Sequence, residues 1–562
     1  MKHHSTHLRA ALLLAVIPMF VALTPVRTAV AASSLLPTRI VQAAKSRVAA
    51  GEYPALVIAV VNDGKSHVYT FGKLAGGKAP DADTVFEIGS VTKTFTATLL
   101  AEAVKSGRDT LDEPVAKLLP GFTIPSRNGK HITLGSLAEQ YSGLPRLPTN
   151  LQPSDPNNPY ADYDAAKLKS FLAGYTLPRD PGSQYEYSNL GVGLLGYALA
   201  QQGGTSYGAL VEEKILKPLG MTLSGVEIRP AMHKHLAVGH DGQGKPTENW
   251  DLDVLAGAGA IKSTGHDMLR YLEANMGVTK TPLDAAMRFA HKPRLPVGGD
   301  EQIGLVWMTR HDKDGDVIWH NGMTGGYASF LGFTADGKHG VVVLTNIGQS
   351  VDDLGFATLL PDAKLASTET AIHLSKQALD EYAGSYRLRP HFILTVFRQG
   401  GQLLAQATGQ GALPIYPSAR NEFFAKMADI RITFKRGKND KVTELVLHQN
   451  GDHAAPRISG AEAARDTSQK PVVTLPESTL KEYVGHYQLA PGREFDITLK
   501  HGQLYAQLTG QGAFPIYASK KDEFFYTIVN AQISFQRGKD GKVTGLVLHQ
   551  SGRDLPAPRG KD

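Results

Sequence analysis

The sequence contains no cysteine. A chain without thiols forms no disulfide, has no thiol nucleophile, and lacks the thiolates that bind zinc in most structural sites. Its 20 histidines are scattered along the chain. None of them forms an H-E-x-x-H pair, which would place two imidazoles on one helical face. We therefore expect neither a metal site nor a cofactor.

A large charge excess and long apolar runs are missing as well. The 562 residues carry a formal charge of +6, with 42% hydrophobic and 20% charged residues, which is typical of globular domains. No basic stripe with interleaved aromatic residues occurs, so we expect no nucleic-acid partner. Beyond the N-terminus no apolar run approaches the roughly 20 residues of a membrane-spanning helix. The length predicts about two to four domains.

The first 31 residues have the three parts of a secretory signal peptide. Lys2 and Arg9 supply positive charge, residues 10–23 are apolar, and Ala29-Val30-Ala31 has the small residues of a cleavage site. The apolar run is shorter than a membrane span, which favours cleavage over a single membrane anchor. Cleavage would remove three basic residues and no acidic one, lowering the formal charge from +6 to +3. We expect a periplasmic or secreted protein.

Two copies of one unit occupy the last third of the chain. Glu381-Tyr382-Ala383-Gly384 matches Glu482-Tyr483-Val484-Gly485 at an offset of 101 residues, and other matched segments keep that offset. A constant offset indicates tandem domains. Each copy alternates short hydrophobic segments with glycine-containing turns, which predicts a small antiparallel β-barrel. We place the barrels at residues 375–455 and 476–556, with a linker from about residue 452 to about residue 476.

The remaining residues, 33–365, are predicted to form one α+β domain. Strand patterns occur near both of its ends and helical patterns between them, so we expect one antiparallel sheet, closed by the two ends and flanked by helices. A helix is predicted over residues 90–106, with Gly107 as its left-handed cap. The strands are predicted over residues 55–61, 67–71, 317–320, 328–334 and 340–346.

A pattern for a nucleophile stands at the start of the predicted helix, in Ser90-Val91-Thr92-Lys93. Residues three apart share a helical face, so Lys93 should lie beside the Ser90 hydroxyl. A lysine that is partly desolvated has a lowered pKa and can remove the serine proton. The alternative is a helix N-cap serine followed by a solvated lysine, because S-x-x-K alone is a common pattern.

A second element is Tyr187-Ser188-Asn189. A phenol next to a protonated lysine has its phenolate favoured and can act as a base. The Asn189 amide can hold Lys93 and orient a substrate carbonyl. A tyrosine and an asparagine in a loop are otherwise usually structural.

The third element is the glycine-rich stretch of residues 319–327. Its glycines, Gly322 among them, let a strand edge approach a bound substrate closely. The Met323 N–H is a candidate oxyanion donor, together with the N–H of Ser90. His320 is a candidate proton relay or a ligand for a substrate carboxylate; the alternative is a strand histidine satisfied by the backbone.

Taken in order, S-x-x-K, Y-x-N and H-x-G resemble the motifs of the penicillin-recognising serine hydrolases. That branch holds class C β-lactamases, DD-peptidases, D-aminopeptidases and related esterases, and the resemblance covers residues 56–346. It implies a serine β-lactamase/transpeptidase-like fold with Ser90 as nucleophile, Lys93 as its activating partner and Tyr187 as the proton-relaying base. Asn189 would contact the substrate amide. The repeats resemble the lipocalin-like barrels that follow the catalytic domain in some peptidases of the family.

One departure from the family pattern bears on the substrate. β-Lactamases of this branch have K-T-G on the third strand, where this chain has His320-Asn321-Gly322. A histidine with an ordinary pKa of about 6.5 is mostly neutral at pH 7, unlike lysine. We therefore expect an exported serine hydrolase that acts through an acyl-enzyme as a D-residue-specific peptidase, amidase or esterase.

Other functions stay open at this level. They are a class C-like β-lactamase, a penicillin-binding or sensor protein without turnover, and a carbohydrate-binding protein whose catalytic domain is inactive. The expected partner is a small-molecule or short-peptide substrate, with cell-wall fragments among the candidates.

Overall fold

The structure is a computed structural model. The residues that it describes are 34–366, 371–390, 392–408, 412–425, 430–449, 451–467, 472–490, 492–500, 502–509, 513–526, 531–550 and 553–560. The predicted signal peptide, residues 1–31, lies outside them. Within the described part of the chain no helix is long and apolar enough to cross a bilayer.

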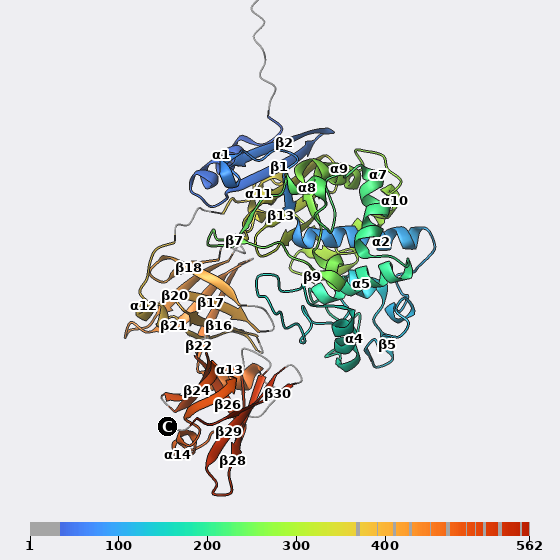
Figure 1. Cartoon of the computed structure of the whole chain (residues 1–562). Helices are drawn as coiled ribbons and strands as arrows, with labels where there is room; N and C mark the ends of the chain where they lie inside the picture. Colours follow the sequence, from blue (N-terminus) through green and yellow to red (C-terminus); the bar gives the residue numbers. More distant parts are fainter. Residues whose placement is uncertain are drawn as a thin grey trace, which may run out of the picture. The chain divides into compact units, whose positions relative to one another are not determined.

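The first domain is built on an eight-stranded antiparallel sheet with the order β2-β1-β14-β13-β12-β11-β10-β9 (Figure 1). The strand nearest the N-terminus, β1, pairs with β14 in the register Leu56↔Thr345, which confirms a sheet closed by the two ends of the domain. Asp63 and Gly64, both at positive φ, form the tight turn between β1 and β2. The strands are β1 (Ala55–Asn62), β2 (Lys65–Gly72), β9 (Leu295–Gly298), β10 (Glu301–Ile303), β11 (Met308–Arg310), β12 (Val317–Met323), β13 (Ala328–Thr334) and β14 (His339–Thr345).

Both faces of this sheet are buried at its centre, as β1 shows: its residues 55–61 are all hydrophobic and all buried. Along β1, alternate side chains enter different cores. Leu56 and Ile58 pack with helices α1 (Thr38–Ala49) and α11 (Asp352–Leu359) on one face. Val57 and Ala59 belong to the larger core on the other face, which includes α9 (Gly265–Met276). The sheet is therefore the middle layer of the domain.

The second face carries the helical part of the domain, centred on helix α2 (Thr92–Lys105). Most α2 side chains are buried, and its last turn leads to Gly107 at φ +77°, the left-handed position expected from the sequence. Short strands β3 (Val85–Glu87) and β8 (Lys262–Thr264) pair beside it. The other helices are α3 (Leu134–Ala138), α4 (Ala165–Gly174), α5 (Asn189–Gln202), α6 (Tyr207–Val211), α7 (Lys217–Leu219), α8 (Pro230–His233) and α10 (Asp284–His291).

The two repeats fold as separate eight-stranded antiparallel sheets. In the first, β15 pairs with β22 in the register Ser385↔Ile458, which closes the barrel. In the second, Tyr487 of β23 bridges to Arg559, just beyond β30. The strands of the first are β15 (Gly384–Arg389), β16 (Phe392–Gln399), β17 (Gln402–Ala407), β18 (Leu413–Ala419), β19 (Glu422–Phe424), β20 (Arg431–Arg436), β21 (Val442–His448) and β22 (Asp452–Ile458). Those of the second are β23 (Gly485–Ala490), β24 (Arg493–Lys500), β25 (Gln503–Leu508), β26 (Ala513–Lys520), β27 (Glu523–Tyr526), β28 (Ala531–Arg537), β29 (Val543–Gln550) and β30 (Arg553–Pro558).

A strand and a helix occupy residues 452–467 of the segment predicted as a linker between the repeats, and the prediction was wrong for these residues. Strand β22 occupies Asp452–Ile458, and helix α13 follows at Gly460–Thr467. Most of this strand is exposed and only Ala455 is buried, so its sequence has no alternating hydrophobic pattern; it closes the barrel by pairing with β15 and β21.

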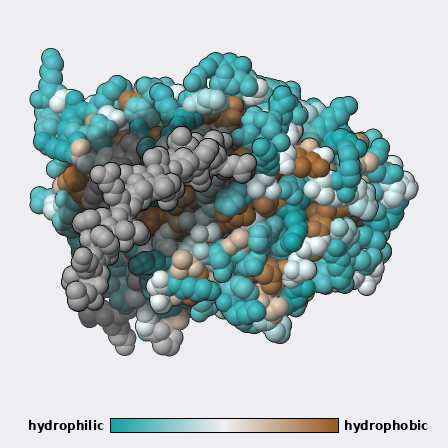
Figure 2. Space-filling view, turned by 90° about the horizontal axis from the view of Figure 1, so that it is seen from above, coloured by the Kyte–Doolittle hydropathy of each residue, from teal (hydrophilic) through white to brown (hydrophobic). Residues whose placement is uncertain are grey.

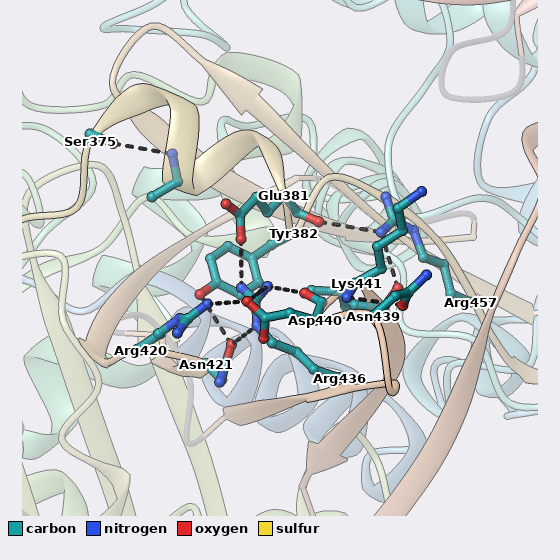
Figure 3. Close-up of polar contacts among 12 residues, drawn as sticks. Ser375, Glu381, Tyr382, Arg420, Asn421, Arg436, Asn439, Asp440, Lys441 and Arg457 are labelled. Atoms are coloured by element: carbon teal, nitrogen blue, oxygen red, sulfur yellow. Dashed lines mark hydrogen bonds and ion pairs between the residues drawn. The ribbon is translucent and has the colours of Figure 1, made fainter.

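A cluster of charged side chains recurs at the same place in both repeats. In the first, shown in Figure 3, Arg436 donates to Glu381 at 2.8 Å and to Asn421 at 2.7 Å, and Arg457 donates to the Glu381 carbonyl. In the second, Arg537 contacts Glu482 and Asp522 in the same way. Since these arginines are paired and the arrangement is repeated, we assign the cluster to barrel stability and not to ligand binding.

Exposed hydrophobic side chains are few and scattered. The face in Figure 2 is mainly hydrophilic, with hydrophobic residues in small separate groups. The large exposed ones among the described residues are Val238, Val278, Ile372, Val473 and Leu555. No broad apolar patch is visible on this face.

A buried ion pair ties α1 to α11. Arg47, only 4% exposed, donates to both carboxylate oxygens of Asp353, one of them at 3.0 Å, and to the Ala366 carbonyl at 2.8 Å. Glu52 is the only other acid near it among the described residues, at 3.8 Å. Removing one partner of such a pair leaves the other charge buried and poorly compensated.

We expect Asp353→Ala to lower the free energy of unfolding of the first domain by about 3 kcal/mol. All three tryptophans, Trp250, Trp307 and Trp319, lie in this domain, so urea unfolding followed by tryptophan fluorescence reports on it. The matched control is Asp362→Ala, whose partner Lys313 is exposed, and it should cost less than about 1 kcal/mol. Equal effects of the two substitutions would contradict the structural role of the Arg47–Asp353 pair.

Candidate functional site

Ser90 lies in a single 3-10 turn, Gly89–Val91, that leads directly into α2. The sequence placed it on the α-helix itself, and the helix begins two residues later. Gly89 has φ +50°, and a Cβ there would lie 2.6 Å from the Met323 backbone N. A Cβ on Gly322 would lie 2.0 Å from the Ile88 carbonyl oxygen. Glycine at both positions therefore lets the end of β12 approach the turn that carries Ser90.

Lys93 lies beneath Ser90, and its ammonium end is fully enclosed. Its Nζ lies 2.8 Å from Ser90 Oγ and 2.7 Å from the Ala258 carbonyl oxygen. The side chain is 0% exposed. Burial, reinforced by the positive charge of Arg146, lowers the pKa of Lys93 well below that of free lysine. A larger fraction of Lys93 is therefore a neutral amine, which can accept a proton.

Tyr187 approaches Ser90 from the loop before α5. Its hydroxyl donates to Ser90 Oγ at 2.8 Å. The next residue, Ser188, caps α5 by accepting from the Gly191 N–H at 2.8 Å, and this fixes where the loop ends. Burial raises the pKa of Tyr187, while the Ser90 contact and the Arg146 charge oppose that rise. The phenol is protonated at neutral pH and is placed to donate.

A small pocket opens beside Ser90. Its wall is uncharged and combines backbone from Gly89 and Gly259 with aromatic and aliphatic side chains. Two polar side-chain atoms of this wall, Asn189 Oδ1 and Thr324 Oγ1, are buried without a hydrogen-bond partner among the described residues. Such atoms gain most when a bound molecule satisfies them. The lining residues are Gly89, Ser90, Tyr160, Asn189, Trp250, Leu252, Leu255, Ala258, Gly259, Met323 and Thr324.

His320 is held as a neutral imidazole. It is 4% exposed, and burial together with the charge of Lys93 lowers its pKa to about 3. Its Nδ1 lies 2.6 Å from the Asn321 carbonyl oxygen, and because a carbonyl only accepts, Nδ1 carries the proton. His320 therefore provides no positive charge for a substrate carboxylate at neutral pH. Its ring centroid lies 6.4 Å from that of Tyr187.

The structure thus brings together the residues that the sequence singled out. Ser90, Lys93 and Tyr187 form one hydrogen-bonded group, and Asn189 and Met323 line the pocket with Ser90. Glycine at position 322 lets β12 lie close to the turn that carries Ser90. Thr324 lies in the stretch of residues 319–327 that the sequence analysis singled out, although it was given no role there. The sequence analysis did not select the pocket residues Tyr160 and Trp250, nor Arg146. These three come from irregular segments without periodicity, so only folding reveals that they are neighbours.

The described residues contain no group of three or more histidine, aspartate or glutamate side chains close enough to hold a metal ion.

Comparisons with known proteins agree with this geometry. The family described as Beta-lactamase matches residues 40–361. The family described as Domain of unknown function (DUF3471) matches residues 368–463 and again residues 469–558, in accord with the tandem repeat. The two matches divide the chain into the α+β domain and the two barrels.

Individual relatives cover the first domain. The chain is 29% identical over 328 residues to a protein named Beta-lactamase from Pseudomonas fluorescens, over 52% of this chain and 88% of that protein. It is 27% identical over 324 residues to the D-alanyl-D-alanine-carboxypeptidase/endopeptidase AmpH of Escherichia coli (strain K12), over 52% of this chain and 82% of that protein.

Solved structures show the same fold. A class C beta-lactamase matches with a TM-score of 0.51 and 24% identity, over 58% of this chain and 98% of that chain. A Beta-Lactamase/D-Alanine Carboxypeptidase from Pseudomonas syringae matches with a TM-score of 0.51 and 22% identity, over 58% and 99%. With residues 40–361, more than half of the chain, matching one family, the protein belongs to the Beta-lactamase family and is a serine hydrolase.

Proposed function

We propose that this serine hydrolase is exported, forms an acyl-enzyme on Ser90, and acts on short peptides with D-residues or on small esters. The observation that carries the proposal is the position of Ser90 Oγ, which lies 2.8 Å from both Lys93 Nζ and the Tyr187 hydroxyl. A serine is a poor nucleophile until a neighbour takes its proton, and here two neighbours with shifted pKa values are in place.

The proposed reaction starts with transfer of the Ser90 proton to neutral Lys93, as Ser90 Oγ bonds to the substrate carbonyl carbon. The N–H groups of Ser90 and Met323 stabilise the oxyanion. Tyr187 then donates its proton to the leaving nitrogen or oxygen, the bond to the leaving group breaks, and Lys93 returns a proton to Tyr187. A water molecule then bonds to the acyl carbon and gives a proton to Lys93; the bond to Ser90 Oγ breaks, Lys93 returns the proton to Ser90 Oγ, and the acid product leaves. The pKa directions favour Lys93 over Tyr187 as the first base.

The third motif supports peptides or esters over β-lactams. His320 stands where β-lactamases of the resembling branch have lysine, and with a pKa of about 3 it is neutral. A relative named as a D-alanyl-D-alanine-carboxypeptidase/endopeptidase matches over 82% of its length. The second candidate is a β-lactamase, which the name of another relative favours. A penicillin-binding protein without turnover is the third.

Turnover by purified mature protein on four substrates tests the proposal. They are nitrocefin, D-alanyl p-nitroanilide, a D-Ala-D-Ala peptide and p-nitrophenyl acetate. We expect steady hydrolysis of a peptide, anilide or ester, and at most a single burst on nitrocefin. Ser90→Ala should reduce kcat by at least about 10³-fold, as removal of a nucleophile does, without changing the urea midpoint. Fast nitrocefin turnover would establish the β-lactamase alternative, and full activity of Ser90→Ala would rule out Ser90 as nucleophile.

The pH profile of kcat/KM tests Lys93 as the base. Because the pKa of Lys93 is lowered, activity should rise with pH as the neutral amine forms, and the rise should be complete well below the ordinary lysine value of about 10.4. Below its lowered pKa, Lys93 is protonated and accepts no proton. The Lys93→Ala substitution should lower kcat/KM by about 10²–10⁴-fold. It should also remove the fall of kcat/KM at low pH. An acid limb that persists in Lys93→Ala would assign the limb to another group.

Export is tested by the mass of the mature protein. Expressed in a Gram-negative host, the chain should be recovered from periplasm or medium with cleavage after Ala31, since the N-terminus has the parts of a signal peptide. Ala31→Glu, which places a charged side chain at the cleavage site, should yield the uncleaved form. Retention of residues 1–31 on the wild-type protein would contradict the proposed cleavage.

A further inference from the structure

Arg146 lies next to Tyr187 of the site, and no acidic side chain among the described residues pairs with its charge. It follows the Ser142-Gly143-Leu144-Pro145 turn, and its side chain is exposed. Its guanidinium carbon lies 5.0 Å from the ring centroid of Tyr187. Among the described residues it forms no ion pair and no side-chain hydrogen bond, whereas most other arginines of the domain are paired.

The backbone of Arg146 is fixed to the catalytic elements. Its carbonyl oxygen accepts from the Asn189 N–H at 3.0 Å and the Leu190 N–H at 3.3 Å, at the first turn of α5. The residue therefore moves with Asn189, which lines the pocket. Its positive charge lowers the pKa of Tyr160, Tyr187 and Lys93 relative to what burial of the tyrosines and of the lysine alone would give.

The rest of the pocket provides no comparable charge. None of its lining side chains is ionised at neutral pH, the Lys93 pKa is lowered, and His320 is neutral. Arginine keeps its charge at any pH that a protein experiences. The planar guanidinium of Arg146 lies against the Tyr187 ring, so its N–H groups remain available at the edge of the plane. Two of these N–H groups can bind the two oxygens of a carboxylate.

We infer that Arg146 binds a carboxylate carried by the substrate, so that Ser90 acts preferentially on anionic esters or peptides. This inference rests on the proposed function. The carboxylate belongs either to the acyl group that is transferred to Ser90 or to the leaving group, as in a peptide with a free C-terminus. Both sources present the same chemistry to the guanidinium, and two pairs of substrates distinguish them.

The experiment compares matched substrates that differ only in the carboxylate. The ester pair is p-nitrophenyl butyrate and p-nitrophenyl hemiglutarate, which share a leaving group and differ on the acyl side. The peptide pair is an acetylated D-Ala-D-Ala peptide with a free C-terminus and its C-terminal amide. The quantity measured is the ratio of kcat/KM, anionic over neutral, within each pair. Effects of Arg146 on the pKa of Lys93 or on Tyr187 change both members alike and cancel in this ratio.

In the wild type we expect a ratio above one in at least one pair. Arg146→Gln should lower that ratio roughly tenfold, the size of one charge-assisted hydrogen bond. Arg146→Lys should keep part of the preference, and Arg146→Glu should reverse it. Because the guanidinium is exposed, salt should weaken the wild-type preference. Arg288→Gln, which removes the same charge from α10, is the matched control and should leave the ratio unchanged.

Each outcome has a defined meaning. A fall in the ester ratio places the carboxylate on the acyl side, and a fall in the peptide ratio places it on the leaving group; either supports the inference. Ser90-dependent turnover with both ratios unchanged in Arg146→Gln overturns the role of Arg146 alone. Absence of Ser90-dependent turnover on all four substrates overturns the proposed function and the inference with it.

Discussion

Burial of the Lys93 amine beside Ser90 is the constraint on which the active site depends. Water would keep Lys93 protonated, and a protonated amine accepts no proton from Ser90. The side chain is fully enclosed by α2 and the segment ending at Ala258, with one polar partner on each side. The surrounding core excludes water from this amine and holds it 2.8 Å from Ser90 Oγ.

The central sheet shapes the site because the end of strand β12 lies close to the turn that carries Ser90. Strand β12 ends at Met323, next to the 3-10 turn that carries Ser90, and the Ser329 hydroxyl of β13 donates to the Ile88 carbonyl at 2.7 Å. Side chains larger than hydrogen at Gly89 or Gly322 would separate strand and turn. The position of the Met323 N–H, a proposed oxyanion donor, relative to Ser90 is thus set by contact between backbone segments.

The charge distribution of the site distinguishes two kinds of cation. Burial lowers the pKa of Lys93, so a larger fraction of its amine is neutral. Arg146 is exposed and keeps its positive charge. His320 is neutral as well, chiefly because its burial lowers its pKa. In our proposals, proton transfer and recognition of an anionic substrate fall to different residues, and the positive charge of Arg146 itself helps to lower the pKa of Lys93. In the barrels, by contrast, Arg436 and Arg537 are paired with acidic side chains.

The sequence by itself determined the tandem barrels, the α+β class and the Ser90–Lys93 pair. Period-two alternation, a constant 101-residue offset and a three-residue helical spacing are local signals that any tertiary arrangement must respect. It predicted a linker where β22 forms, because most of that strand is exposed and its sequence has no alternating hydrophobic pattern. Only the tertiary structure decided that Tyr160 and Trp250 share a pocket with Ser90, that Lys93 is fully buried, and that Arg146 lies on Tyr187. Those relations depend on how segments far apart in the chain pack together, and burial and pKa follow from packing and not from residue order.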